Sequence, residues 1–228
     1  MDATIRVVDL LAQVQLTLVD TAQTRFSLPE LQTYLNAAYR EIVNIRPDAS
    51  TDIGVYTCVP GVRQDLTSAG NFPNAVKLVE VYRNLAAESN QQAVIQIERK
   101  TLDDQRRGWP NDPVSLNIEH FIYDPRVPWQ FLVYPPAAIG AQLEVAYSVT
   151  PLPHALSLAQ LQNPATPDTI NLVDAYANAC LEYIKYQCYT KDAGDPSNAG
   201  RAVAHFNAFN QCLGGKTASD KADQPGAA

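Results

Sequence analysis

The chain opens with hydrophobic and polar positions that alternate at the period of an amphipathic helix. Between Ala3 and Asp20 apolar side chains recur every three or four residues, at Ile5, Val8, Leu11 or Ala12, Val14 and Leu18. Leu10, Leu16 and Val19 widen this stripe beyond one face. A helix that is apolar on more than one side usually packs on two partners, and we expect another subunit to be one of them.

A second helix follows with a cleaner pattern. Ser27 precedes Pro29 and Glu30, a spacing that predicts a capping box with the Ser27 hydroxyl and the Glu30 carboxylate each bonding the other's amide. The helix should end before Pro47, whose ring disfavours helix at Arg46. Its apolar stripe is Leu31, Leu35, Ala38, Ile42 and Ile45.

From Thr51 to Val149 the period changes to two, which indicates β-strands. The turn Asp124–Pro128 should join two strands as an antiparallel pair. Between Thr101 and Pro113 we expect one helical turn and a loop around Trp109. The predicted strands are Ile53–Val59, Val76–Arg83, Ala93–Glu98, Ile118–Tyr123, Gln130–Tyr134 and Gln142–Ser148.

After a proline-bearing connection the helical period returns. We expect one helix over Leu172–Lys191 and a last one over Asn198–Leu213, ended by Gly214 and Gly215. The polar segment from Lys216 onward has the composition of a disordered tail.

The order of elements predicts an α+β fold, in which N- and C-terminal helices form a bundle with an inserted antiparallel β module. The predicted boundaries are 1–50 and 168–215 for the bundle, 51–150 for the β module, 151–167 for a linker and 216–228 for the tail.

Charge makes a nucleic-acid-binding surface unfavourable. The net charge is −7 and the sequence pI is about 4.9, so the surface should repel phosphate backbones. The densest basic patch, Arg99–Lys100 with Arg106–Arg107, is interrupted by Asp103 and Asp104. This balance still permits DNA to slide through a ring of such subunits. We find no signal peptide and no apolar run long enough for a membrane span.

The four cysteines do not have metal-ligand or disulfide spacing. They are Cys58, Cys180, Cys188 and Cys212. Cys180 and Cys188 would lie about 12 Å apart along one helix, too far for a disulfide. We expect four reduced, mostly buried thiols.

No catalytic motif is present. The sequence lacks a phosphate-binding G-x-x-x-x-G-K-[ST], a G-x-G-x-x-G and a G-x-S-x-G elbow. The histidines His120, His154 and His205 stand in no motif with a nucleophile. The carboxylate pairs Asp103–Asp104 and Asp192 with Asp195 are better explained as solvated groups. We therefore predict no enzyme activity, and no catalytic, cofactor-binding or metal-binding residue.

A set of weak motifs in a fixed order is more specific. They are Tyr34–Val43 followed by Arg46–Ala49, then Pro60–Leu66, Val81–Asn84, Val133–Pro136, Glu144–Ser148 and, last, Tyr186–Ala193 followed by Asn198–His205. In this order, over about residues 25–213, the chain resembles the adaptor family of the head-to-tail connector of tailed bacteriophages.

The resemblance implies a structural virion protein, made in the host cytoplasm, with no catalytic residues to carry over. It implies a ring, commonly twelve-fold, that binds the portal protein and joins it to a tail tube or nozzle protein. DNA would pass through this ring without sequence-specific binding. We expect the C-terminal segment, Asn198–Ala228, to dock on the portal.

Two other functions remain open. A glycan- or receptor-binding β module would bring Trp109, Trp129 and Tyr123 into one groove. A hydrolase would bring Asp103, Asp104 and His120 into one pocket.

Overall fold

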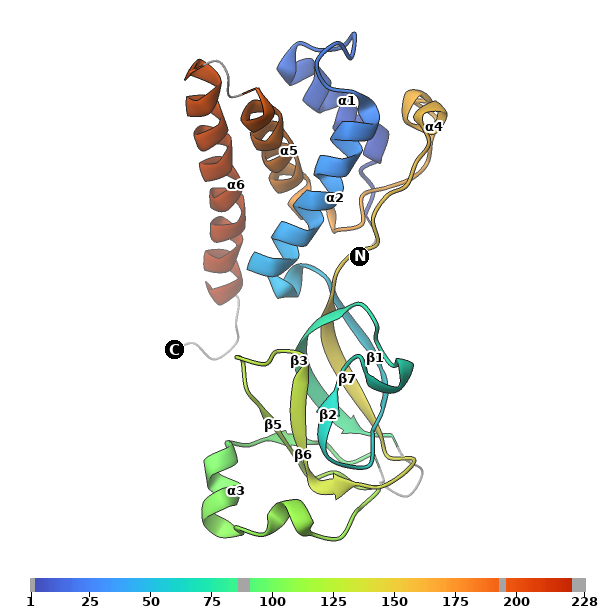
Figure 1. Cartoon of the computed structure of the whole chain (residues 1–228), viewed down its shortest axis with the longest axis vertical. Coiled ribbons are helices and arrows are strands. Elements are labelled where there is room, and N and C mark those ends of the chain that lie inside the picture. The colour runs from blue at the N-terminus through green and yellow to red at the C-terminus, as the bar shows by residue number, and fades with distance from the viewer. Residues whose placement is uncertain (1–2, 86–90, 193–195, 223–228) are drawn as a thin grey trace. The chain divides into compact units, whose positions relative to one another are not determined.

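The computed structural model describes residues 3–85, 91–192 and 196–222, and the chain divides into two compact units (Figure 1). The helical unit consists of Met1–Ala49 and Pro151–Ala228, and the β unit of Ser50–Thr150. All the strands that the structure describes lie in the β unit. The predicted α+β class is therefore confirmed.

The helical unit is built around α5, which packs against α1, α2 and α6 (Figure 1). Its central side chains Cys180 and Ile184 are fully buried. Between α5 and α6, Nδ1 of His205 lies 2.6 Å from Oε2 of Glu182. The α-helices of this unit are α1 (Val7–Leu18), α2 (Leu28–Ile45), α4 (Leu158–Gln162), α5 (Ala177–Lys191) and α6 (Pro196–Ala222).

Helix α2 has the bounds and most of the core face predicted from its stripe. Leu31, Leu35, Ala38 and Ile42 are fully buried, whereas Ile45 at the end of the helix is exposed. The capping box predicted at Ser27 is not formed, because the Ser27 hydroxyl makes no capping bond.

A complete capping box lies elsewhere, in the segment predicted to be a linker. The Ser157 hydroxyl accepts from the Gln160 amide, and the Gln160 side chain accepts from the Ser157 amide. These bonds start α4, whose Leu161 is buried. The segment predicted as a linker, 151–167, thus contains a short helix that was not predicted, because one buried leucine is too weak a periodic signal.

The other helix boundaries also differ from prediction. Helix α1 is shorter than Ala3–Asp20. A 3-10 turn, Asp174–Tyr176, occupies the predicted start of α5. Helix α6 runs through Gly214 and Gly215 to Ala222, so these glycines do not end it. Residues 216–222, predicted as a disordered tail, are helical, and 223–228 lie outside the described residues.

The β unit contains two sheets. One has the strand order β1-β7-β3, with β1 (Thr51–Thr57), β7 (Gln142–Val149) and β3 (Ala75–Asn84) all antiparallel. The other has the order β2-β6-β5-β4, with β2 (Gly61–Asp65), β6 (Gln130–Ala137), β5 (His120–Tyr123) and β4 (Ile95–Gln96). The predicted β5–β6 pairing across Asp124–Pro128 is confirmed.

The sheets enclose a core and carry one helix. Tyr56, Phe131 and Val145 are among the buried side chains of this core. Helix α3 (Arg99–Gln105) and a 3-10 turn at Trp109–Asn111 form the predicted helical turn and loop. Two details correct the prediction. Strand β2 was not expected, and β4 pairs parallel with β5, so the module is mixed rather than wholly antiparallel.

The cysteines are free, as predicted. Cys58, Cys180 and Cys188 are buried and Cys212 is partly exposed. Burial raises the pKa of Cys58, Cys180 and Cys188 to about 12, so these thiols are not nucleophilic at neutral pH.

Candidate interaction surfaces

The acidic pair and the histidine proposed for hydrolysis do not meet in a pocket. Asp103 accepts a hydrogen bond from Trp109 Nε1 at 2.9 Å and pairs with Arg99 at 3.3 Å. The ring of His120 instead stacks on Tyr134, in a hollow that neither Asp103 nor Asp104 lines. The described residues contain no group of three His, Cys, Asp or Glu side chains placed to hold a metal ion. Asp195, from the other carboxylate pair, lies outside the described residues.

The three aromatic residues proposed for ligand binding are also separated. Trp109 is buried against Leu102 and Ile122 and meets Tyr134 edge-on. Trp129 is 45% exposed and lines a hollow beside Thr67 and Pro128, whereas Tyr123 lines a different groove. The structure therefore gives no groove shared by the three.

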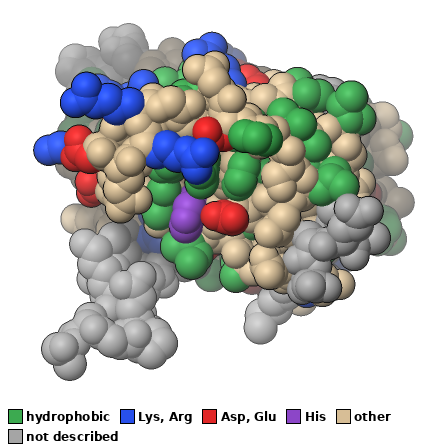
Figure 2. All heavy atoms as spheres, turned by 90° about the horizontal axis from the view of Figure 1, so that it is seen from below, with side chains coloured by type: hydrophobic (Ala, Val, Ile, Leu, Met, Phe, Trp, Pro, Cys, Tyr) green, Lys and Arg blue, Asp and Glu red, His purple; other side chains and the backbone are tan. Residues whose placement is uncertain are grey.

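Positive charges are dispersed among acidic ones. Arg106 pairs with Asp112 at 2.9 Å, as Arg99 does with Asp103. On the face drawn in Figure 2, Lys and Arg side chains lie beside Asp and Glu, with apolar side chains between them. Such a surface suits contact with a protein better than a grip on a phosphate backbone.

A groove of about 580 Å³ lies on the outer face of the second sheet, with residues from all four strands in its lining. Its lining includes the apolar side chains of Ile122 and Leu132 and the charged side chain of Arg63. The hairpin at its rim is held by Arg126 and Asp124, 2.7 Å apart. Hydrogen bonds from Arg126 lower the pKa of Asp124 to about 2, so this ion pair persists in acid. A groove that is lined by both apolar and charged side chains suits contact with a protein.

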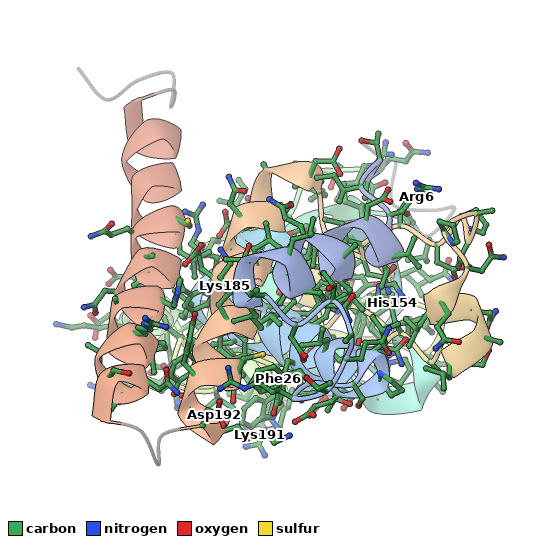
Figure 3. The ribbon with its side chains drawn as sticks, turned by 90° about the horizontal axis from the view of Figure 1, so that it is seen from above. Arg6, Phe26, His154, Lys185, Lys191 and Asp192 are labelled. Atoms are coloured by element: carbon green, nitrogen blue, oxygen red, sulfur yellow. The ribbon has the colours of Figure 1, made fainter. Side chains whose placement is uncertain are left out.

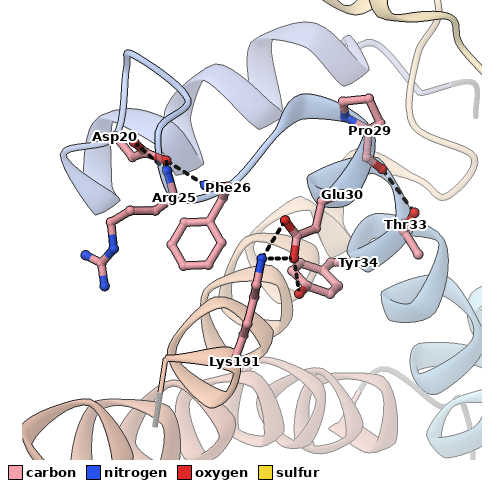
Figure 4. A network of polar contacts seen from close by, with 8 residues as sticks. All are labelled: Asp20, Arg25, Phe26, Pro29, Glu30, Thr33, Tyr34 and Lys191. Atoms are coloured by element: carbon pink, nitrogen blue, oxygen red, sulfur yellow. Dashed lines mark hydrogen bonds and ion pairs between the residues drawn. The ribbon is translucent and has the colours of Figure 1, made fainter. Parts of the chain in front are cut away.

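In the helical unit, the turn between α1 and α2 is held by one buried carboxylate. Asp20 accepts hydrogen bonds from the amides of Thr24 at 2.8 Å, Arg25 at 3.0 Å and Phe26 at 2.8 Å. Figure 4 shows the bonds from Arg25 and Phe26. Burial alone would raise the pKa of Asp20, but these bonds outweigh it and hold the pKa at about 2.

This turn presents aliphatic side chains to solvent. Leu16 is 67% exposed, and Val19 is 90% exposed with a left-handed backbone at φ 55°. β-Branched residues rarely adopt that conformation, which costs about 1–2 kcal/mol. The valines and the other leucines of α1 are buried, whereas Ala12 is exposed. Of the three residues that widen the predicted stripe, Leu10 is therefore buried and Leu16 and Val19 are exposed at the C-terminal end of the helix.

Helix α5 is tied to the start of α2 close to this turn. Lys191 Nζ lies 2.7 Å from Oε1 of Glu30, which also accepts from the Tyr34 hydroxyl at 2.7 Å (Figure 4). Phe26, Lys191 and Asp192 lie together in Figure 3, and Lys191 Nζ is 5.5 Å from the centre of the Phe26 ring. These contacts make the α1–α2 turn and the end of α5 one fixed surface.

His154, labelled in Figure 3, connects the segment before α4 to α2. The Tyr39 hydroxyl accepts from the Asn171 amide at 3.2 Å, and it shares a hydrogen bond of 3.0 Å with His154 Nε2. Burial lowers the pKa of His154 below its usual value.

These features define an α+β protein whose exposed apolar and mixed-charge surfaces suit protein partners. No helix in the described ranges combines the length and apolar character of a membrane span. The family model described as SU10 adaptor protein matches residues 5–228. The chain therefore belongs to this family of phage head-to-tail adaptors. A comparison with curated proteins gives no match.

Proposed function

We propose that this protein is the adaptor ring of a phage neck, present in the virion after synthesis in the host cytoplasm. The ring joins the portal protein to a tail tube or nozzle protein, is twelve-fold like the portal, and surrounds the DNA exit channel. Membership of the adaptor family over residues 5–228 is the observation that carries this proposal.

The α1–α2 turn supplies a lateral contact between ring neighbours in this proposal. The hydrogen bonds of Asp20 hold the turn rigid. The turn therefore loses little conformational entropy when a neighbouring subunit covers the exposed side chains of Leu16 and Val19. Head-to-tail contacts of this kind close into a ring when the rotation between neighbours divides a full turn.

The charge distribution supports passage of DNA without retention. The net charge of −7 is unfavourable for binding phosphates, and Arg99 and Arg106 of the densest basic patch are paired with aspartates. DNA then moves through the ring without sequence-specific contacts, and no cofactor or catalytic residue is needed.

The test is reconstitution with purified portal protein, followed by native mass measurement and electron microscopy. We expect a closed ring on one end of the portal. Leu16→Asp should weaken the assembly, whereas Leu158→Asp, at another exposed leucine of the helical unit (48% exposed), should leave it unchanged. A lone copy bound away from the portal axis would contradict the ring.

A further inference from the structure

Strand β1 is an edge strand, so the amides and carbonyls of alternate residues point toward β7 and away from the sheet. The Val149 amide donates to the Ser50 carbonyl at 2.9 Å, and the Cys58 amide donates to the Ala141 carbonyl at 2.9 Å. Because the direction alternates along an antiparallel strand, the even-numbered residues from 50 to 58 face β7. Thr51, Ile53, Val55 and Thr57 therefore direct their amides and carbonyls away from the sheet.

Two side chains limit the open part of this edge. Asn71 occupies the far end, where its side chain accepts from the Thr57 amide at 2.9 Å and donates to the Thr57 carbonyl at 3.0 Å. The Asp52 carboxylate accepts from the Ile53 amide at 2.8 Å. Within the described part of the chain, no group hydrogen bonds to the outward side of Thr51 or Val55. An open edge thus extends over residues 51–55.

The other edges of the described β unit are shorter or covered. Along β3, the Leu78 amide donates to the Pro128 carbonyl at 2.8 Å and the Asn84 amide to the Gln92 carbonyl at 2.9 Å. Along β2, the Tyr56 hydroxyl bonds both the amide and the carbonyl of Asp65. Strand β4 is only two residues long. A second copy therefore offers one open run that matches β1, namely its own β1.

The side chains of this edge are self-complementary. Ile53 is 56% exposed and Val55 is 53% exposed, on the face opposite the core. If two β1 strands pair antiparallel with Ile53 opposite Ile53, Thr51 faces Val55 and Asp52 faces Gly54. β-Branched residues then meet across the strands, and neither acidic side chain faces another one.

We propose that β1 of the free protein pairs antiparallel with β1 of a second copy, which joins two three-stranded sheets into one. Asp52 acts as a gate, because its carboxylate must leave the Ile53 amide before the strands pair. This two-fold contact closes on itself, so it differs from the head-to-tail contact of the proposed ring and does not depend on that ring. The dimer is the form of the protein outside the connector.

The test is the mass of the full chain by sedimentation over a range of concentrations. Wild type should dimerise. Val55→Pro removes one outward amide donor from each copy, and Ile53→Lys places two cations at the centre of the contact. Each should weaken dimerisation about tenfold or more. Circular dichroism and urea unfolding check that both variants fold.

Two further variants sharpen the test. Val79→Lys changes an exposed valine of β3 in the same sheet (47% exposed) and should leave the dimer intact. Asp52→Ala frees the Ile53 amide and should tighten the dimer several-fold, by about the value of one hydrogen bond.

Three results would overturn the proposal: a wild type that stays monomeric, a dimer that survives Val55→Pro and Ile53→Lys, or one that Val79→Lys disrupts equally. Amide exchange at residues 51–55 that slows only when portal protein is added would assign this edge to the portal instead. Ring assembly is measured separately on the portal, so either proposal can fail alone.

Discussion

The ring of Phe72 lies directly over the backbone of Gly54 in β1. A Cβ atom at Gly54 would stand 2.7 Å from Cε1 of Phe72. The same ring stacks on Tyr147, with ring centres 4.0 Å apart, so Phe72 is confined on both sides. Gly54 therefore provides the space in which this aromatic pair packs.

Gly54→Ala should lower the free energy of unfolding by about 1–3 kcal/mol, because the added methyl group displaces Phe72. Urea unfolding measures the change. Gly200→Ala is the matched control, since a Cβ on this exposed residue of α6 meets nothing within 4 Å. That substitution should raise stability by about 0.5–1 kcal/mol. Equal effects of the two substitutions would contradict the packing described.

Ser157→Ala should destabilise α4 by about 1 kcal/mol, because it removes the hydroxyl of a complete capping box. Ser27→Ala should have little effect, because the Ser27 hydroxyl caps nothing. Amide hydrogen exchange at residues 157–162 measures the effect of Ser157→Ala on α4, and exchange at residues 27–31 measures the effect of Ser27→Ala on α2. Faster exchange at the start of α2 in Ser27→Ala would show that this hydroxyl does cap the helix in solution.

Stability should fall as the pH drops below about 6.5. Burial lowers the pKa of His154 in the folded state, so protonation is favoured in the unfolded chain. The contribution of His154 to the free energy of unfolding is complete above its pKa in the unfolded chain, near 6.5. It is lost as the pH falls toward and through the lower pKa of the folded state. His154→Gln should show a flatter dependence of urea midpoint on pH in this range. If His154→Gln leaves the pH dependence of the urea midpoint unchanged, that dependence arises from other titrating groups.

Val19→Gly should raise the free energy of unfolding by about 0.5–1 kcal/mol, because glycine adopts the left-handed backbone at this position without a Cβ clash. Val203→Gly, at an exposed valine inside α6 (61% exposed), should instead lower it by about 0.5 kcal/mol. Thermal unfolding checks both signs. A loss of stability in Val19→Gly would mean that the valine side chain is covered in solution.

Truncation tests the proposed docking of the C-terminal segment on the portal. A chain ending at Gly215 should fold by circular dichroism, with less helix because it lacks the last residues of α6. Its co-sedimentation with portal protein should weaken. A chain ending at Ala222 keeps α6 and serves as the control. Full portal binding by the shorter chain would limit docking to the remaining helix.

The elements that were predicted correctly are those in which apolar residues recur at a regular spacing and are buried in the structure. Helix α2 was predictable because Leu31, Leu35, Ala38 and Ile42 all face the core. Strand β2 was not predictable in this way. Its fully buried side chain is Gln64, which bonds the carbonyls of Val59 and Gly61 and gives no apolar alternation.

Local sequence signals failed where tertiary contacts outweighed them. Gly214 and Gly215 resemble a helix end, yet α6 continues through them, and Leu213 just before them is buried. Ser27 and Ser157 both begin capping motifs in the sequence, and only the second forms a capping box. The extent of the open edge of β1 depends on which main-chain groups Asn71 and Asp52 occupy, which no pattern along the chain reveals.

The chain enters and leaves the β unit at adjacent points. Strands β1 and β7, its first and last, pair directly, and the Val149 amide donates to the Ser50 carbonyl at 2.9 Å. The two ends of the insert are thus only about 5.5 Å apart between Cα atoms. The β unit is therefore an insertion whose two ends lie side by side. A short turn between residues 49 and 151 can replace it without stretching the helices, and a different domain with adjacent termini can be transplanted in its place.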